Sequence, residues 1–343
     1  MIDIDLDLKE EEKAMAKSQK ASDRPLVTFA LVAYNQERYV RAAIEGAFSQ
    51  TYEPLEIILS DDCSADRTFE IMQEMASSYD GRHTVWIRRN ETNLGMAGHM
   101  NAVVNAASGE LIAWAAGDDI SMPHRVSLLS APIIQDSHVI SAHSSLIEID
   151  TDGNQLGLRN FSVDRNELDF MKMIELEAGI ISQTHIFRKI VFQKFGPLDV
   201  NLANETLAMT FRELCLGRII FVDKPTIYYR IDSGVSNYRG SDVNLCTITE
   251  PLKVSKWRFS EFSQMCNDFN VLNVIDESLM GKIVQKKLYY DCLVRINSKP
   301  FALKAVFELV AIRLFDTKAA WAFLRRSSPE FVRLLYVKVV LGR

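Results

Sequence analysis

The alternation of short apolar runs with amphipathic segments between residues 25 and 119 limits the possible fold most strongly. Four apolar runs predict β-strands, at residues 26–33, 55–59, 84–87 and 111–115. Helices are predicted between them, at residues 41–49, after a cap at Ser64 or Asp66, and at residues 100–107. Strands that alternate with helices at this spacing predict a parallel sheet covered by helices on both faces.

Polar residues follow three of these predicted strands. Tyr34-Asn35 comes after the first strand, Asp61-Asp62 after the second, and Asp118-Asp119 after the fourth. Ligands of parallel α/β sheets bind outside the carboxyl ends of the strands. The sequence therefore predicts a ligand site at this edge of the sheet.

Asp118-Asp119 indicates a cation site. The preceding Gly117 lets the backbone turn at the end of the strand. Two adjacent carboxylates in a cleft repel each other unless a divalent cation or hydrogen-bond donors neutralise them, and hard oxygen ligands suit Mg²⁺ or Mn²⁺. A solvated loop with two surface acids is the alternative, and the strand context together with a second acid pair favours the cation.

The ends of the first two predicted strands are suited to binding a nucleoside. A carboxylate of Asp61 or Asp62 can accept a hydrogen bond from a base N–H or a ribose hydroxyl, and Tyr34 can stack on a base. Purely structural roles remain open. Tyr34 can be a half-buried core aromatic, and both aspartates can cap a helix, a role for which Ser64 competes.

Composition and charge exclude several other classes of protein. The formal charge is −6, from 39 Lys and Arg against 45 Asp and Glu, which argues against a nucleic-acid binder. Five scattered cysteines without C-x-x-C spacing favour reduced thiols in a cytoplasmic protein over disulfides or a zinc site. Residues 1–24 form an acidic arm without a signal-peptide core, and no run reaches the roughly 18 apolar residues of a membrane span.

Predicted strands and helices no longer alternate regularly in the second half of the chain. It predicts a long strand at 139–149 with a turn at Asp152-Gly153, a helix at 205–216, a strand at 219–222, an edge-like extended segment at 225–230, and helices beyond about residue 244. Residues 299–343 carry nine Lys and Arg against three Asp and Glu. This basic tail either lies on an anionic membrane surface or packs as a helical subdomain on the catalytic core or a partner subunit.

An ordered set of short motifs identifies a resemblance. The set comprises Ala33-Tyr34-Asn35, Ser49–Tyr52, Glu56–Ile58, Asp61–Asp66, Asn93-Leu94-Gly95, Asn101, Ala107–Glu110 and Gly117-Asp118-Asp119. In this order the motifs resemble the family 2 glycosyltransferases of GT-A fold, closely over residues 25–130 and more loosely to about residue 237. The resemblance implies an α/β fold, a Rossmann-like mixed sheet flanked by helices, with a C-terminal helical extension.

The same resemblance implies a domain division and a function. A GT-A domain would span 25–237, with a nucleotide-binding half at 25–130 and an acceptor half at 131–237, followed by a helical basic region at 238–343. Such enzymes move a sugar, with inversion, from a nucleotide-sugar to an acceptor hydroxyl. The expected donor is a UDP- or dTDP-sugar. The expected acceptor is a glycan or lipid-linked glycan of cell-surface polysaccharide synthesis, met in the cytoplasm or at the inner membrane face.

The resemblance also implies roles for individual residues. Ala33 and Tyr34 would bind the nucleotide, with Tyr34 stacked on its base. Asp62 would accept from the N–H edge of the base. Asp118 would contact ribose or metal, and Asp119 would hold Mn²⁺ or Mg²⁺ against the diphosphate, whose negative charge grows as it departs.

Two departures from the family pattern remain open. Counting back six residues from Arg212, the usual Asp base is replaced by Thr206, so Glu205 becomes the candidate base unless it merely caps the helix after Asn204. Asp232 stands where relatives often carry His, and is either a metal ligand or a turn residue. If the base is lost, the chain is an inactive nucleotide-sugar-binding protein. A sugar nucleotidyltransferase is less favoured, because the chain lacks a Gly-rich phosphate loop.

Overall fold

The computed structural model describes residues 24–159, 168–177, 179–202, 204–231, 251–272 and 276–298. Two compact units make up the chain: Met1–Ser241 with Asn267–Val274, and Asp242–Cys266 with Ile275–Arg343. The acidic arm, apart from its last residue, and the basic tail at 299–343 both lie outside the described residues.

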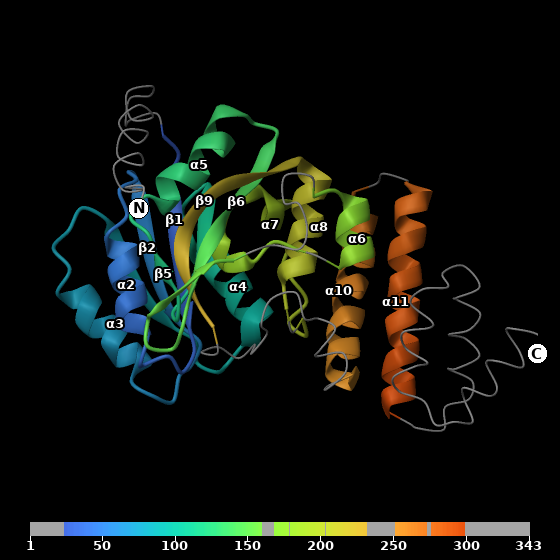
Figure 1. Cartoon of the computed structure of the whole chain (residues 1–343), viewed down its shortest axis with the longest axis horizontal. Helices are drawn as coiled ribbons and strands as arrows, with labels where there is room; N and C mark the ends of the chain where they lie inside the picture. The colour runs from blue at the N-terminus through green and yellow to red at the C-terminus, as the bar shows by residue number, and fades with distance from the viewer. Residues whose placement is uncertain are drawn as a thin grey trace, which may run out of the picture. The chain divides into compact units, whose positions relative to one another are not determined.

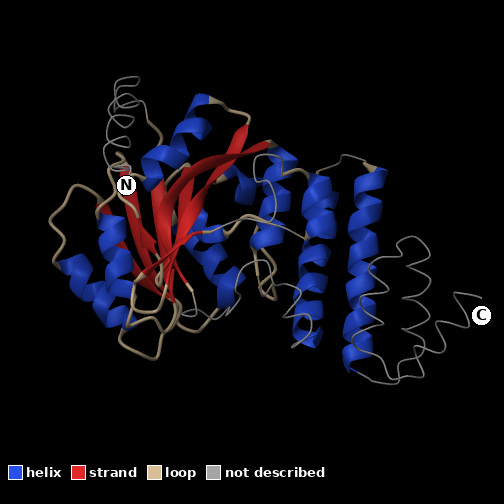
Figure 2. Cartoon of the chain, in the orientation of Figure 1, coloured by secondary structure: helices blue, strands red, loops and turns tan. Residues whose placement is uncertain are grey.

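The first unit is built on a mixed sheet, which confirms the predicted fold class (Figure 2). Its strands are β1 (Val27–Ala33), β2 (Leu55–Asp61), β3 (Thr84–Arg89), β4 (Leu111–Ala116), β5 (Ile120–Ser121), β6 (Val139–Ile149), β7 (Gln155–Leu158), β8 (His185–Arg188) and β9 (Arg218–Arg230). Their order is β3-β2-β1-β4-β8-β6-β9-β5, and β7 pairs with β6. The strands β1 to β4 are parallel, as predicted, while β8 runs antiparallel to both β4 and β6.

Helices cover both faces of this sheet (Figure 1). One face carries α2 (Val40–Phe48), α3 (Thr68–Ser77) and α5 (Arg125–Gln135), and the other carries α4 (Gly95–Ala106), α7 (Ile190–Phe195) and α8 (Thr206–Leu216). Strand β1 supplies both cores, because successive side chains of a strand point to opposite faces. Phe29 and Leu31 join the first core, whereas Ala30 and Val32 join the second. The strand β1 is therefore buried along its whole length.

Helix α4 begins at Gly95, five residues before the predicted start at 100. Its first turn carries the glycines Gly95 and Gly98, which lack helical preference. The turn is stabilised instead from outside the helix, because the Asp62 carboxylate accepts hydrogen bonds from the N–H groups of Leu94 and Gly95. A contact so distant in the sequence leaves no local pattern.

Strand β9 joins two segments that the sequence separates. The predicted strand at 219–222 and the edge-like segment at 225–230 form one strand, which lies between β6 and β5 rather than at an edge. Pro225 has no N–H to donate, and the pairing register shifts there, between Ser144 and Ser145 of β6. The strand resumes beyond this irregularity and ends at Arg230.

Further helical segments lie between β7 and β8 and after β9. They are α6 (Phe170–Leu176), the short 3₁₀ helix η3 (Ser182–Thr184), α10 (Pro251–Val271) and α11 (Glu277–Ser298). In the second unit, the rings of Phe262 and Tyr290 stack with centroids 5.9 Å apart. The expectation of helices beyond residue 244 is thus confirmed over the described part of α10 and α11. None of the helices in the described ranges combines the length and apolar character needed to cross a bilayer.

A buried ion pair joins α8 to the C-terminal end of α10 within the first unit. Arg212, which is fully buried, donates to both carboxylate oxygens of Asp268 at 2.7 and 2.9 Å. The same guanidinium donates to the backbone oxygens of Gly196 and Pro197. Arg212 therefore stabilises the loop before α8 through these hydrogen bonds.

Asp268→Ala is expected to lower the free energy of unfolding by about 3–5 kcal/mol, because it leaves the Arg212 guanidinium buried without its counter-ion. The midpoint of urea unfolding measures this change. Arg41→Ala is the matched control: its exposed ion pair with Glu74 contributes less than about 1 kcal/mol. Equal shifts for the two variants would contradict the structural role given to the buried pair.

Candidate active site

The strand register brings the polar strand ends to one edge of the sheet. Ala33 of β1 pairs with Asp61 of β2, and Val32 pairs with Ala116 of β4. The backbone continues this alignment beyond the strands, because Asp62 N donates to Ala33 O at 3.0 Å and Gly117 N donates to Val32 O at 2.8 Å. The residues that follow each strand therefore leave the sheet side by side.

Gly117 is needed for this close approach of β1 and β4. A Cβ atom at this position would lie 2.5 Å from Gln36 Oε1 and 2.7 Å from the Cβ atom of Ala33. No side chain fits without moving one strand end away from the other. The glycine thus keeps the Asp118-Asp119 turn next to the residues that follow β1.

The end of β9 holds the acid pair in place. Asp118 and Asp119 are both buried, and Asp119 Oδ1 accepts from the backbone N–H of Arg230 at 2.8 Å. The Arg230 guanidinium donates to the backbone oxygens of Asp118 at 3.0 Å and of Asp150 at 2.7 Å, and it lies 4.6 Å from the centre of the Tyr39 ring. The pair is therefore anchored through backbone atoms and one carboxylate oxygen.

The surroundings of the acid pair disfavour ionisation of Asp119. Burial raises the pKa of Asp119 well above its ordinary range, and the neighbouring Asp118 charge raises it further. The opposing effects of the Arg230 N–H and of the charges on Arg125 and Arg230 on that pKa are smaller. A divalent cation would relieve this repulsion, so the two carboxylates fit a hard cation.

The protein supplies few further ligands for such a cation. Among the described residues, no group of three or more His, Cys, Asp and Glu side chains is placed to hold a metal ion. Asp232, the other candidate ligand, lies outside them. Mg²⁺ and Mn²⁺ are commonly bound by one or two carboxylates together with substrate phosphates and water. Asp118 and Asp119 match that mode rather than a closed structural metal site.

Tyr34 stands exposed at the end of β1. Its side chain is 39% accessible, in contrast to the fully buried strand before it. The backbone beyond Tyr34 is fixed by Asn35, whose N–H donates to Ser64 Oγ at 2.9 Å and whose Oδ1 accepts from Ala65 N at 2.8 Å. The hydrogen bonds of Asn35 therefore fix the loop that carries Tyr34, and the exposed part of the ring is accessible to a ligand.

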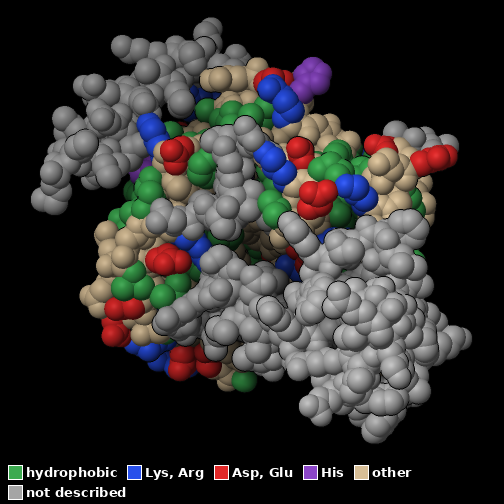
Figure 3. All heavy atoms as spheres, turned by 45° about the vertical axis from the view of Figure 1, so that its right-hand side comes forward, with side chains coloured by type: hydrophobic (Ala, Val, Ile, Leu, Met, Phe, Trp, Pro, Cys, Tyr) green, Lys and Arg blue, Asp and Glu red, His purple; other side chains and the backbone are tan. Residues whose placement is uncertain are grey.

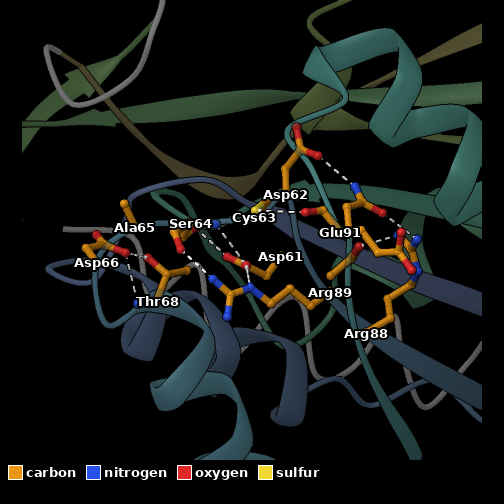
Figure 4. Close-up of polar contacts among 12 residues, drawn as sticks. Asp61, Asp62, Cys63, Ser64, Ala65, Asp66, Thr68, Arg88, Arg89 and Glu91 are labelled. Atoms are coloured by element: carbon orange, nitrogen blue, oxygen red, sulfur yellow. Dashed lines mark hydrogen bonds and ion pairs between the residues drawn. The ribbon is translucent and has the colours of Figure 1, made fainter.

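Asp61 and Asp62 point in different directions and do different work (Figure 4). Asp61 is fully buried, accepts from the N–H and hydroxyl of Ser64, and pairs with Arg89 Nε at 3.1 Å. Asp62 accepts from Asn90 Nδ2 at 2.6 Å and from the backbone at the start of α4. Asp61 therefore shapes the turn, while Asp62 caps α4 rather than the nearby α3.

Glu205 occupies the N-cap position of α8 and is 3% exposed, but its side chain makes no capping hydrogen bond. Asn204 Oδ1 instead accepts from Thr206 N at 2.9 Å. The Thr206 methyl group is directed at Gly179, where it lies 2.6 Å from the position that a Cβ atom would take. The helix start therefore does not depend on the Glu205 carboxylate.

Arg125 is not among the residues predicted from the sequence, because no helix is predicted at α5. Arg125 is fully buried and donates to Ser121 Oγ at 2.8 Å and to Trp114 O at 2.6 Å. Burial lowers its pKa to about 10, against the raising effect of Asp119. This buried arginine stabilises the turn after the acid pair through these hydrogen bonds, and it places a positive charge near Asp119. The only sequence pattern that could have indicated this role is the position of Arg125, a charged residue, at the start of an apolar segment.

Comparisons of the sequence place the chain among glycosyltransferases. Residues 28–196 match the family described as glycosyl transferase family 2. EpsE of Bacillus subtilis, which is named as a glycosyltransferase, is 33% identical over 129 residues, covering 38% of this chain and 46% of EpsE. An uncharacterized glycosyltransferase of Haemophilus influenzae is 35% identical over 125 residues, covering 36% and 38%. The chain thus matches less than half the length of these two relatives.

Solved structures share the fold. TarS 1–349 of S. aureus in complex with UDP-GlcNAc has a TM-score of 0.53 at 17% identity, covering 83% of this chain and 88% of that one. Mannosyltransferase PcManGT of Pyrobaculum calidifontis, in complex with GDP-Man and Mn²⁺, has a TM-score of 0.51 at 15% identity, covering 98% and 87%. The fold is that of the GT-A glycosyltransferases. Residues 28–196 therefore form a domain that matches glycosyl transferase family 2.

Asp119→Asn is expected to raise the melting temperature at pH 7.5 by about 2–4 °C, the shift that about 1 kcal/mol produces in a domain of this size. Because the pKa of Asp119 is raised in the folded protein, its contribution to stability is complete below the ordinary carboxyl pKa and is lost as the pH rises through the folded value. The gain from the amide should therefore vanish near pH 4.

Thermal unfolding of the metal-free protein at several pH values measures this difference. Asp152→Asn is the control, since the Asp152 carboxylate is exposed and paired with Arg38. A gain for Asp119→Asn that persisted unchanged at acidic pH would show that ionisation of the buried Asp119 carboxyl is not its cause.

Proposed function

We propose that this chain transfers a sugar, with inversion, from a UDP- or dTDP-sugar to a hydroxyl group of a glycan or lipid-linked acceptor. The observation that carries the proposal is the convergence of Tyr34, Asp62 and the Asp118-Asp119 pair at one edge of a family 2 domain. The nucleotide-sugars bound by TarS and PcManGT support the choice of donor class.

Each residue at this edge has a chemical task toward the donor. Tyr34 would stack on the base, beside the backbone of Ala33, and Asp62 would accept a hydrogen bond from a base N–H. Asp118 would accept a hydrogen bond from a ribose hydroxyl or bind the cation, and Asp119 would bind Mn²⁺ or Mg²⁺. The cation, when bound, supplies positive charge against the departing diphosphate.

Glu205 is proposed as the base. Its carboxylate would take the proton of the acceptor hydroxyl while the acceptor oxygen bonds to the anomeric carbon and the bond from that carbon to the diphosphate oxygen breaks. Its freedom from helix capping supports this role, because the carboxylate is not committed elsewhere at the helix start. Thr206 cannot serve, since a hydroxyl is not a base at neutral pH.

A catalytically inactive nucleotide-sugar-binding protein is the second candidate. The observation that favours it is Thr206, which stands where the family carries its base and packs its methyl group against Gly179. In that case the donor would bind at the same residues without turnover. The two candidates differ only in the fate of the bound sugar, so a turnover assay separates them.

We also propose that the enzyme works on the cytoplasmic side of a membrane, in cell-surface polysaccharide synthesis. The basic composition of residues 299–343 supports contact with anionic lipid headgroups. Figure 3 shows acidic and basic side chains of the described residues interspersed on the face it presents, rather than gathered by sign. The tail is the segment proposed for electrostatic contact, and flotation with anionic vesicles at low and high salt tests it.

Glu205→Gln is expected to lower kcat by about 10²- to 10⁴-fold with little change in donor affinity, because the amide cannot accept the proton. The assay measures nucleoside diphosphate release with Mn²⁺, a panel of sugar nucleotides and candidate acceptors. Glu70→Gln, on the exposed side of α3, is the control and should keep full activity. Full activity of Glu205→Gln would refute the base assignment, and donor binding without turnover in the unmodified protein would establish the inactive candidate.

Calorimetry should show that Mn²⁺ strengthens UDP binding, and that Asp119→Asn removes this enhancement because one cation ligand is lost. Tyr34→Ala should weaken UDP binding about 10- to 100-fold, the range expected for one base stacked on an aromatic ring, while the Mn²⁺ effect remains. The split between the two variants separates base stacking from cation binding. If Mn²⁺ changed the affinity of neither UDP nor dTDP, the proposed function would fail.

A further inference from the structure

The Asp62 carboxylate is nearly saturated with hydrogen bonds from the protein. An ionised carboxylate offers about four lone-pair positions, two on each oxygen. Oδ1 accepts from Asn90 Nδ2 at 2.6 Å and from Leu94 N at 2.9 Å, while Oδ2 accepts from Gly95 N at 3.1 Å. With the donors that the described residues supply, one position therefore remains, and it is on Oδ2.

The amide that fills Oδ1 is itself held firmly. Asn90 is 6% exposed, its N–H donates to Asp61 O at 2.9 Å, and its Oδ1 accepts from Arg88 Nη2 at 2.6 Å. The amide cannot be reversed, because reversal would turn its NH₂ group toward the guanidinium and its oxygen toward the carboxylate. Asn90 is thus locked with its donor on Asp62.

Arg88 is anchored in turn by a buried pair. Its Nη1 donates to Ser60 Oγ at 2.7 Å, and Ser60 Oγ lies 2.6 Å from His99 Nε2. Burial lowers the pKa of His99 to about 4, so its ring is neutral at physiological pH and adds no charge against Arg88. The chain of contacts from α4 through β2 and β3 to Asp62 is therefore continuous.

The bases of nucleotide-sugars differ in the number of hydrogen-bond donors that they present to such a carboxylate. Uracil and thymine present one ring N–H, which needs one acceptor position. Guanine presents a ring N–H beside an amino group, and these two parallel donors need one free position on each oxygen. With Oδ1 filled, the second guanine donor would be desolvated without a partner, which costs about 1–3 kcal/mol.

We propose that Asn90, oriented by Arg88, is a specificity-determining residue that restricts Asp62 to one further hydrogen bond and so selects uracil or thymine over guanine. This inference rests on the proposed function and adds the residue that chooses the base. Asn90 acts through Asp62, so it is a positioning residue rather than one that touches the reacting atoms.

The test compares UDP and GDP binding to the whole chain by calorimetry with Mn²⁺. The unmodified protein should bind UDP about 10- to 100-fold more tightly than GDP, the ratio that one unpaired donor produces. Asn90→Ala frees one position on Oδ1 and should narrow this ratio at least about tenfold. A merely structural role would weaken both nucleotides equally and leave the ratio unchanged.

Two further variants make the test specific. Asn93→Ala is the control, because Asn93 Oδ1 accepts from Gly95 N at 2.9 Å and its removal frees no position on Asp62. Arg88→Lys serves if Asn90→Ala does not fold: it keeps the charge, loses the paired donors, and should narrow the ratio by releasing the amide.

Each outcome bears on a different proposal. A narrowed ratio in Asn90→Ala with an unchanged ratio in Asn93→Ala supports the inference. GDP binding as tight as UDP binding in the unmodified protein, or an unchanged ratio in Asn90→Ala, overturns the inference while the proposed function stands. Binding of neither nucleotide overturns both.

Discussion

The parallel pairing of β1 with β2 and β4 is the constraint on which the site depends. Because the register aligns Ala33 with Asp61 and Val32 with Ala116, three separate loops leave the sheet at one level. A shift of one residue in either pairing would turn the strand side chains to opposite faces and exchange the two cores. The same burial that stabilises β1 therefore fixes the position of the chemistry.

A second constraint comes from the other half of the unit. Strand β9 reaches the acid pair only because it continues past Pro225, and its last residue, Arg230, meets Asp119 through a backbone N–H. The acid pair thus follows β4 in the parallel part of the sheet, and the end of β9 in the mixed part holds it through a hydrogen bond. Burial of two carboxylates is unfavourable for folding, and this clamping is how the fold tolerates it.

Local patterns predicted the parallel half well, because β1, β2 and β4 have long apolar runs and each acid pair lies at the end of a strand. They failed where a contact joins distant segments. The early start of α4 depends on Asp62, and Arg125 and Asn90 gain their roles only through neighbours that the fold brings together. Polar residues at such positions look like ordinary loop residues in a sequence.

The location of Arg88 on β3, and of Asn90 directly after it, has an evolutionary consequence. This strand is the outermost of the sheet on its side, paired only with β2 among the described residues. Peripheral strands tolerate substitution more readily than the central β1, whose packing serves both layers. Substitutions at Arg88 and Asn90 could therefore change which nucleotide the protein binds. The acid pair and its contacts with Arg230 would stay unchanged.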